Sequence, residues 1–268
     1  MCELFGVSTS TAVRLYYSLG EFAQHGGAKH INRSGWGIAY YIGKDVLLIR
    51  DVEAAMQSPW VSFLEEHGLK SHCTISHVRY ATRGAPVIAN THPFRRELGG
   101  RMHVFAHNGD IGSIFRRIPF ESRDFRPVGA TDSEYAFCIL LQRLASVWGA
   151  CDGSVPDLQK RLDVIVETAA EFRKLGSANF LYSDSDVLFA HGHRRRFDDD
   201  GTFGPPRPPG LCIGKTRQVA KGLEIEWPAS KTAGVMVASV PLTENGWEPL
   251  PEGCVIALNN GREVARIA

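Results

Sequence analysis

The chain opens with Met1-Cys2-Glu3-Leu4-Phe5-Gly6-Val7, in which a β-like run begins directly after a cysteine. Removal of Met1 in front of a small side chain would expose Cys2 as the N-terminal residue. Cys2 would then carry a thiol nucleophile and an α-amine, whose reference pKa of roughly 7.7–8.0 leaves it partly neutral at pH 7. Such an amine can act as the base for its own side chain. The alternative is that Cys2 is a small buried residue at the start of a strand.

The length and composition favour a soluble globular protein. A chain of 268 residues suits one large domain or two small ones, and the sequence shows neither an internal repeat nor a linker, so we expect a single domain over residues 1–268. The net charge of +1 gives no bulk electrostatic support for binding nucleic acid or anionic membranes. Since no apolar run is long enough to span a bilayer and no signal peptide is evident, we expect a cytoplasmic location.

The cysteine and histidine spacing does not predict a metal site or a disulfide. His103-x-x-x-His107 matches the ligand spacing of a metal-binding helix, but the segment is typical of a strand and has no Glu between the histidines. No Gly-rich phosphate loop is evident, so we expect no cofactor. The six cysteines form no CxxC pair and are expected to be reduced thiols: Cys2, Cys73, Cys138, Cys151, Cys212 and Cys254.

Short runs rich in Val, Ile, Phe and Tyr recur along the chain and predict β-strands. Asn259-Asn260-Gly261 predicts a tight hairpin turn into Glu263–Ile267. The predicted strands are Leu4 to Val7, Gly35 to Ile42, Val46 to Arg50, Cys73 to Tyr80, Met102 to His107, Ala178 to Ser183, Val187 to His191, Gly234 to Val240 and Val255 to Leu258.

Helical periodicity is clear in two segments. Apolar residues recur at helical spacing from Leu158 to Phe172, and again after Thr131, where Thr131-x-x-Glu134 is a capping-box pattern. A third helix is expected from about Val13 to Gln24. Strand clusters separated by a few helices indicate a layered α+β domain. The stretch 194–210, with the run Arg194-Arg195-Arg196, three aspartates and four prolines, predicts a solvated surface loop.

Four polar clusters interrupt the apolar runs: 77–84, 90–94, 105–110 and 129–134. Each has an ordinary structural explanation. They are respectively a surface ion pair, a structural histidine in a rigid turn, an Asn-Gly turn, and an acidic residue favoured by a helix N-terminus.

Together the clusters match one kind of ligand. Arg79 is suited to bind an α-carboxylate and Asp132 an α-ammonium. Cys2 would attack an amide, and the Asn108 side chain beside the Gly109 N–H supplies two donors for an oxyanion. A ligand that needs all of these groups is an α-amino acid with a side-chain amide, such as glutamine or a γ-glutamyl amide.

The same residues resemble the class II glutamine amidotransferases, which are N-terminal-nucleophile hydrolases. The stretches Ser34–Tyr41 and Arg126–Gly129 narrow the resemblance to the stand-alone YafJ-like branch. The chain departs from the family at Tyr80 and Arg83, where Trp and His are usual. The matching motifs are Met1-Cys2, His77-Val78-Arg79-Tyr80-Ala81-Thr82, Asn90-Thr91-His92-Pro93, His107-Asn108-Gly109 and Thr131-Asp132-Ser133-Glu134.

The resemblance implies a four-layer αββα sandwich and a site at a strand end. It implies Cys2 as the nucleophile with its own α-amine as the base, and Asn108 with Gly109 as the oxyanion hole. It further implies that the amino-acid head group is held by Arg79, Thr82, His92 and Asp132.

The expected reaction is hydrolysis of L-glutamine to glutamate and ammonia through a γ-glutamyl thioester on Cys2. One alternative is hydrolysis of another γ-glutamyl amide, such as a glutathione-type peptide or an ergothioneine precursor. A second is a non-catalytic glutamine-binding module. Because no synthetase domain is evident, the partner expected to consume the ammonia is a separate enzyme.

Overall fold

The computed structural model describes residues 2–15, 34–79, 85–121, 124–151, 153–199, 202–215, 225–226 and 232–268. Thr82, Tyr80 and Arg83 lie outside these ranges, as does most of the helix expected from Val13 to Gln24.

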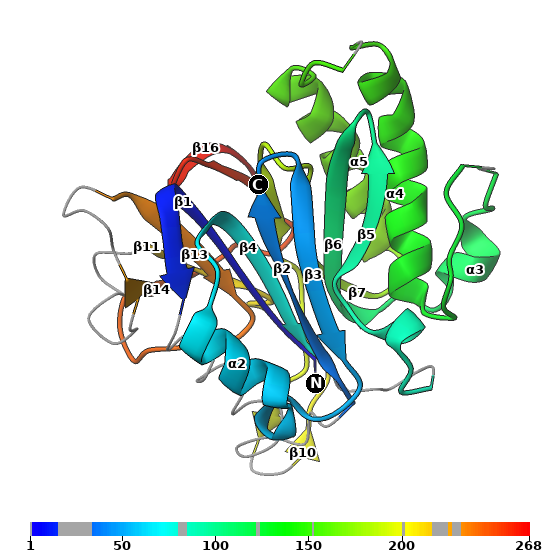
Figure 1. Ribbon diagram of the computed structural model, residues 1–268. Helices are drawn as coiled ribbons and strands as arrows, with labels where there is room; N and C mark the ends of the chain where they lie inside the picture. The colour runs from blue at the N-terminus through cyan, green and yellow to red at the C-terminus, as the bar shows by residue number, and fades with distance from the viewer. Residues whose placement is uncertain are drawn as a thin grey trace.

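The first sheet is antiparallel, with the strand order β14-β11-β13-β1-β4-β2-β3, and β12 pairs with the end of β1. It is the sheet that faces the viewer in Figure 1. Its strands are β1 (Glu3–Leu15), β2 (Trp36–Ile42), β3 (Asp45–Asp51), β4 (Ser71–Val78), β11 (Cys212–Lys215), β12 (Ile225–Glu226), β13 (Gly234–Ala238) and β14 (Trp247–Pro249).

The second sheet, also antiparallel, has the order β16-β15-β8-β7-β6-β5. Its strands are β5 (Phe94–Leu98), β6 (Arg101–Asp110), β7 (Ser177–Ser183), β8 (Leu188–His191), β15 (Val255–Asn259) and β16 (Arg262–Ile267). The helical elements are α2 (Pro59–His67), α3 (Ile114–Arg117), α4 (Asp132–Gly149) and α5 (Leu158–Arg173), with short 3-10 turns η1 (Ala55–Gln57) and η2 (Ile88–Asn90).

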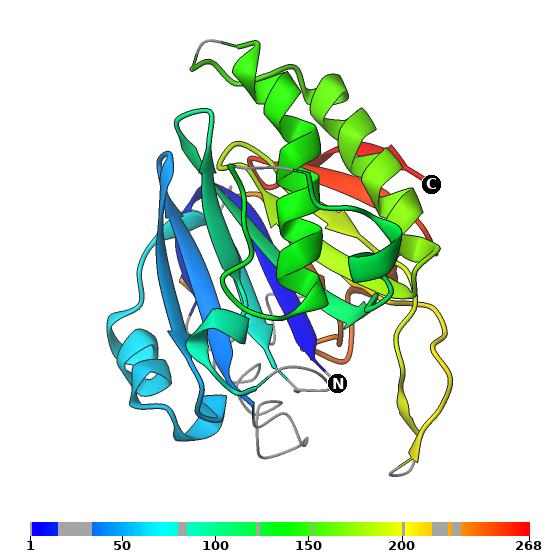
Figure 2. The ribbon, with the colours of Figure 1, turned by 90° about the vertical axis from the view of Figure 1, so that its right-hand side faces the viewer.

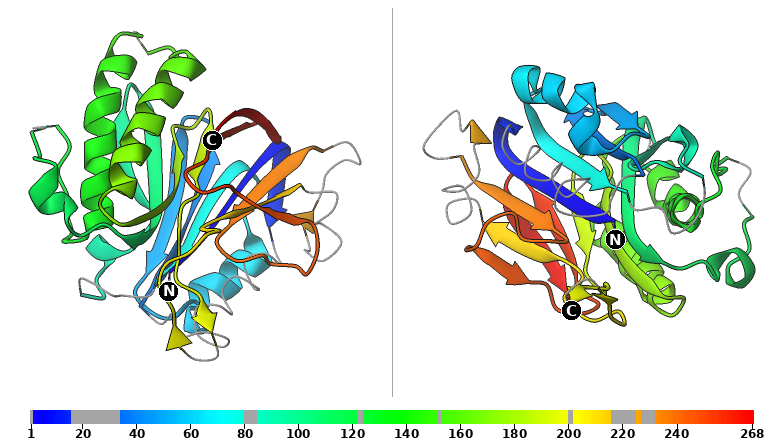
Figure 3. Two further views of the ribbon diagram at one scale, coloured as in Figure 1. Left: turned by 180° about the vertical axis from the view of Figure 1, so that it is seen from behind. Right: turned by 90° about the horizontal axis from the view of Figure 1, so that it is seen from below.

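Three hydrophobic cores separate four layers. One core lies between the two sheets and includes Leu4 and Ile75 from the first sheet and Leu181 from the second. A second core joins the outer face of the first sheet to Val61 and Leu64 of α2. The third packs α4 and α5 against the second sheet (Figures 2 and 3). This arrangement is the predicted αββα sandwich, with helices outside two face-to-face sheets.

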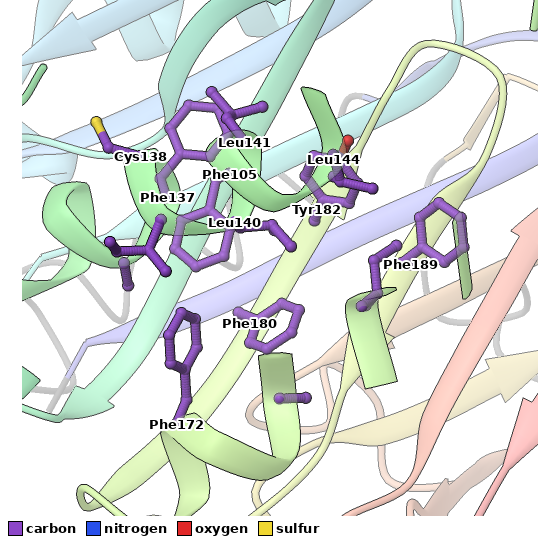
Figure 4. Packing of buried hydrophobic residues seen from close by; sticks show 14 of the residues in the cluster. Phe105, Phe137, Cys138, Leu140, Leu141, Leu144, Phe172, Phe180, Tyr182 and Phe189 are labelled. Atoms are coloured by element: carbon purple, nitrogen blue, oxygen red, sulfur yellow. The ribbon is translucent and has the colours of Figure 1, made fainter. Parts of the chain in front are cut away.

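The core under α4 and α5 is rich in aromatic rings. Phe105 of β6 stacks on Phe137 of α4, with ring centroids 5.4 Å apart, and also contacts Phe180 of β7 (Figure 4). All three side chains are fully buried. Aromatic contacts of this kind contribute about 0.5–1.5 kcal/mol each beyond the burial of their area.

Strand alternation in β1 orients the N-terminal residues. Phe5 and Val7 face α2, whereas Leu4 faces the second sheet. Gly6 lies on the same side as Leu4, where an added Cβ would come within 2.9 Å of Leu181 Cδ1. The absence of a side chain at Gly6, on the face of β1 towards the second sheet, therefore lets the two sheets approach closely near the N-terminus.

Most predicted elements are confirmed, including both long helices and the turn at Asn260, which has a φ of 47°. The predicted helix is wrong at its start, because Val13–Leu15 belong to β1. Val13 pairs with Ser71, and Leu15 pairs with Ile225. Since both side chains are buried against the first sheet, tertiary pairing decides their conformation over local propensity.

Two other segments also differ from expectation. Asn108-Gly109 is not a turn, because β6 continues through it and pairs with Asn179 and Ala178. Within the predicted surface loop 194–210, β9 (Asp198–Asp199) pairs with β10 (Thr202–Phe203), and Arg195 forms a bridge to Arg207. This hairpin projects from the end of the sandwich where the N-terminus lies (Figure 2). In the described part of the chain no helix has the length and apolar character needed to cross a bilayer.

Candidate active site

Four strands, β1, β4, β6 and β13, each have one end at the same edge of the space between the two sheets. Strand alternation places Cys2 on the side of Leu4, Arg79 on the side of Ile75, and Asn108 on the side of Ala106, all facing between the sheets. Ser239 follows β13 and lies beside Leu4. These side chains, far apart in the sequence, form the nucleophile end of the interlayer space.

Asn108 contacts Cys2 directly. Its Nδ2 donates to the Cys2 carbonyl oxygen at 2.5 Å and to Ser239 Oγ at 3.2 Å. The Asn108 carbonyl oxygen accepts from Asn179 Nδ2 at 3.0 Å. Asn179 thus fixes the backbone of Asn108, and the side-chain N–H groups of Asn108 are directed towards the start of β1.

Gly109 is required by close packing of the two strands. A Cβ at this position would lie only 1.8 Å from the Ser177 carbonyl oxygen. No side chain fits there without separating β6 from β7. The backbone of Gly109 therefore stays beside the Asn108 amide, as the predicted pair of donors requires.

Ser239 was not predicted from the sequence. Its Oγ accepts from Leu4 N at 3.1 Å, and its own N–H donates to the Leu4 carbonyl oxygen at 2.9 Å. It therefore fixes the strand that follows Cys2 and also contacts Asn108. The only sequence signal was its place near the end of the predicted strand Gly234 to Val240.

Arg79 is buried, so it does not lie on the surface as the ion-pair alternative considered above requires. Its Nη1 donates to the carbonyl oxygens of Ser34 and Ala85, each at 3.3 Å. Burial lowers the pKa of Arg79, and the negative charge of a Cys2 thiolate acts in the opposite direction. The guanidinium and the thiol are thus close enough to interact electrostatically.

Asp132 lies at the N-terminus of α4, where the helix dipole favours a carboxylate. Its Oδ2 accepts from the Ile111 N–H at 2.9 Å, and Ser133 Oγ lies 3.3 Å from its Oδ1. Ser133 Oγ is also 2.9 Å from His107 Nδ1.

The tautomer of His107 follows from its other ring nitrogen. Nε2 faces the Ser177 carbonyl oxygen at 3.3 Å, which only accepts, so Nε2 carries the proton. Burial lowers the pKa of His107 and favours the neutral ring. Nδ1 then accepts the Ser133 hydroxyl proton, which leaves Oδ1 of Asp132 without that donor.

His92 stacks against His77, with ring centroids 4.2 Å apart, and against Phe94 at 4.5 Å. Both histidines are buried. Burial lowers the pKa of His77 to about 3, with Arg79 and His107 adding to the effect, and burial also lowers the pKa of His92. Neither ring nitrogen of His92 has a hydrogen-bond partner in the described part of the chain. The role of His92 in substrate binding stays a prediction.

Two further residues position the surrounding loops. Asn90 Nδ2 donates to the Ala85 carbonyl oxygen at 3.0 Å, and its Oδ1 accepts from Ala130 N at 2.8 Å. Glu134 Oε1 accepts from Arg96 at 2.5 Å, while its Oε2 accepts from backbone N–H groups at 2.6 and 3.1 Å.

The capping-box prediction is correct for one of its two bonds. The Glu134 N–H donates to Thr131 Oγ1 at 3.2 Å, as expected for the N-cap. The Glu134 carboxylate instead binds Gly129 and its neighbour, so it orders the loop that precedes the helix.

His103 does not form the metal pair considered above. Its Nδ1 lies 2.6 Å from Tyr182 Oη and its Nε2 lies 3.0 Å from the Leu98 carbonyl oxygen. Across the described ranges, no group of three or more His, Cys, Asp or Glu side chains is arranged to hold a metal ion. Each of the six cysteines is a thiol.

A family model described as "Glutamine amidotransferases class-II" matches residues 1–268. The chain is 36% identical to a putative glutamine amidotransferase, YafJ, of Escherichia coli K12, over 71% of this chain and 72% of the relative. It is 28% identical to a putative glutamine amidotransferase of Haemophilus influenzae, over 100% of this chain and 87% of the relative.

Solved structures agree with these relatives. The fold matches a predicted glutamine amidotransferase from Pseudomonas aeruginosa at 30% identity with a TM-score of 0.63, covering 98% of this chain and 100% of that one. It also matches the glutamine phosphoribosylpyrophosphate amidotransferase of Bacillus subtilis at a TM-score of 0.59, covering 99% of this chain and 49% of that one. At 15% identity the second match speaks for the fold alone.

Proposed function

The chain belongs to the class II glutamine amidotransferases, and on that basis we propose that it hydrolyses the side-chain amide of L-glutamine to glutamate and ammonia. The observation that carries the proposal is the convergence of Cys2, Asn108 and Arg79 at one end of the interlayer space. In this proposal they serve as the nucleophile, an oxyanion donor and the cation that binds the α-carboxylate. The proposed unit is a single domain over residues 1–268.

The proposed chemistry begins with removal of Met1, which exposes the α-amine of Cys2. This amine accepts the thiol proton, and Sγ attacks the amide carbon of glutamine. The carbon–nitrogen bond then breaks as the proton passes to the leaving nitrogen, and ammonia departs. Water attacks the resulting γ-glutamyl thioester, giving glutamate and the regenerated thiol.

Asn108 and Gly109 are proposed to stabilise the oxyanion formed in both attacks. One N–H of the Asn108 amide is used by the Cys2 carbonyl oxygen, and the other lies 3.2 Å from Ser239 Oγ. This longer contact is the one that a substrate oxygen can replace. Donors held in place before the reaction contribute more than donors that must reorganise.

Arg79 and Asp132 are proposed to hold the α-carboxylate and α-ammonium, with Thr82 and His92 completing the head-group site. Burial supports this role for Arg79, because a desolvated guanidinium binds a carboxylate more strongly than an exposed one. Asp132 is also buried, and the neutral His107 ring leaves one of its oxygens available.

The acceptor of the ammonia is proposed to be a separate enzyme in the cytoplasm. A relative described as an amidophosphoribosyltransferase, from Methanothermobacter thermautotrophicus, aligns over 53% of this chain but only 29% of its own length.

The test replaces Cys2 with Ala, with Cys73→Ala as the matched control. After intact-mass measurement has confirmed Cys2 as the N-terminal residue, ammonia release from glutamine is expected in the unaltered protein and in Cys73→Ala. It should be undetectable in Cys2→Ala while the circular dichroism spectrum is unchanged. Retained turnover in Cys2→Ala would exclude the thioester route, and binding without turnover in the processed protein would favour a non-catalytic module.

A further inference from the structure

A cavity of about 800 Å³ opens directly beside Asn108 and Gly109. Its far wall comes from two distant segments, Arg116 in α3 and Arg195 with Arg196 after β8. The residues that line it include neither of the proposed head-group residues Arg79 and Asp132. It is therefore a second space that shares only the oxyanion donors with the glutamine site.

The wall of this cavity is basic. Among the described residues it carries three guanidinium groups and one carboxylate, that of Asp110, whose Oδ1 accepts from the Gly112 N–H at 3.0 Å. The protein as a whole has a net charge of only +1. A concentration of arginine in one concave site is the arrangement that recognises carboxylate or phosphate groups.

Arg195 is held rigidly within the wall. Its guanidinium lies over the ring of Phe197, 4.1 Å from the centroid, and Arg207 contacts the same ring at 4.5 Å. Burial lowers the pKa of Arg195, while the nearby Glu3 acts in the opposite direction. The buried Nε of Arg195 has no hydrogen-bond partner among the described residues. Because the aromatic ring holds the guanidinium in place, an acidic ligand would bind to an ordered cation.

The position of the cavity identifies which part of a substrate would enter it. In the proposed binding mode, the γ-amide carbonyl of the substrate lies at Asn108 and Gly109. The amino-acid head group lies at Arg79 and Asp132. The only part of the substrate not yet placed is then the substituent on the amide nitrogen. The adjoining cavity is the space available to it. The volume of the cavity is typical of a small-molecule site. Ammonia, which is the leaving group of glutamine, would fill very little of it.

We infer that the preferred substrate is a γ-glutamyl amide whose leaving amine carries an acidic group bound by Arg116, Arg195 and Arg196. This rests on the proposed function and extends it. The bond changes are those given above, with an amino acid or amino phosphonate in place of ammonia. The Cys2 sulfur bonds to the carbonyl carbon of the γ-amide, the carbon–nitrogen bond breaks, the amine departs with the proton, and water releases glutamate.

The test compares γ-glutamylglycine with γ-glutamylglycinamide, which differ in one charge. We expect kcat/KM to be at least about tenfold higher for the acid, or about 1.4 kcal/mol. A γ-glutamyl aminomethylphosphonate in the same assay distinguishes a carboxylate site from a phosphate site. In R116Q/R196Q, which changes two exposed side chains, the preference should fall below about threefold. Arg117→Gln, an exposed neighbour in α3 outside the cavity lining, should retain it.

Equal kcat/KM for the acid and the amide, or a preference that persists in R116Q/R196Q, would overturn the inference. Hydrolysis of glutamine without an acid preference leaves the proposed function standing and removes only this extension. If nothing is hydrolysed, the proposed function fails, and calorimetry on Cys2→Ala decides the inference separately. At least about tenfold tighter binding of γ-glutamylglycine supports it, and equal affinity for the two ligands overturns it.

Discussion

The two ends of the interlayer space use polar groups in opposite ways. At the end far from Cys2, the hydroxyl of Tyr41 lies 2.8 Å from the Ser183 carbonyl oxygen and 3.1 Å from that of Met102. Ser71 Oγ donates to the carbonyl oxygens of Tyr41 and Cys73, and the Cys73 thiol contacts Ser183 Oγ at 3.8 Å. These groups satisfy one another and the backbone.

At the nucleophile end the polar groups converge on Cys2. Asn108 has one firm acceptor in the Cys2 carbonyl oxygen and one longer contact with Ser239. Arg79 donates to two carbonyl oxygens at 3.3 Å and lies near the Cys2 thiol. The comparison teaches that polar groups at the edge of a sandwich indicate a site when they converge on a nucleophile, and not when they bond only one another and the backbone.

The two cysteines at these ends illustrate the same difference. Desolvation raises the pKa of the Cys73 thiol to about 12, so it stays protonated and is a poor nucleophile. Cys2 is half-buried, and a buried guanidinium lies near it. A nearby cation stabilises a thiolate, which is the reactive form.

Replacing Asn108 with Ala is the strongest test of this comparison after Cys2 itself. Loss of one oxyanion donor is expected to lower kcat for glutamine about 100- to 1000-fold, with a smaller change in KM. Steady-state ammonia release measures both constants.

Ser183→Ala is the matched control at the far end, because it removes a satisfied polar group of the same interlayer space. It should lower the unfolding midpoint in urea without lowering kcat. If both variants lose kcat equally, the two ends do not differ in function.

Arg79→Lys is expected to have the next largest effect. Lysine keeps the charge but cannot form the two parallel hydrogen bonds of a guanidinium. We expect kcat/KM for glutamine to fall about 30-fold or more, or about 2 kcal/mol. Asp132→Asn should behave similarly through the ammonium.

The corresponding far-end change is Arg101→Lys, which alters a guanidinium bound to Ser185 Oγ at 2.7 Å. It should leave kcat/KM within about twofold. A kinetically silent Arg79→Lys would make Arg79 a structural residue and remove the proposed basis for specificity.

The smallest expected effect is on stability and depends on pH. The folded protein holds His77 neutral down to about pH 3, whereas the unfolded chain gains a proton near the ordinary pKa of 6.5. The free energy of unfolding should therefore decrease as the pH falls from about 6.5 towards 3. Urea midpoints at pH 7.5, 6 and 5 measure the slope.

The dependence of the urea midpoint on pH should become weaker in His77→Gln. It should also flatten in His103→Gln, because burial lowers the pKa of His103 to about 4. An unchanged slope in His77→Gln would show that this histidine is not the buried neutral group described here.

The sequence predicted the presence of the strands and helices better than the residues at which they begin and end. Apolar periodicity was sufficient for α4 and α5, because a helix that covers a sheet must present one apolar face. It was insufficient for Val13–Leu15, whose conformation depends on pairing with β4 and β12. Asn108-Gly109 has the composition of a turn but continues β6, because only glycine fits beside Ser177.

The sequence by itself determined the family and the chemical groups of the candidate site. These groups lie in ordered motifs that can be recognised without coordinates, and they belong to Cys2, Arg79, Asn108 and Asp132. Ser239, Asn179 and the basic cavity behind Asn108 belong to no local pattern. They depend on which strands lie next to one another and on where the β9–β10 hairpin leaves the sandwich. Only the tertiary structure decides such contacts, because they join residues more than sixty positions apart, through the pairing of β6 with β7 and through the stacking of the two sheets.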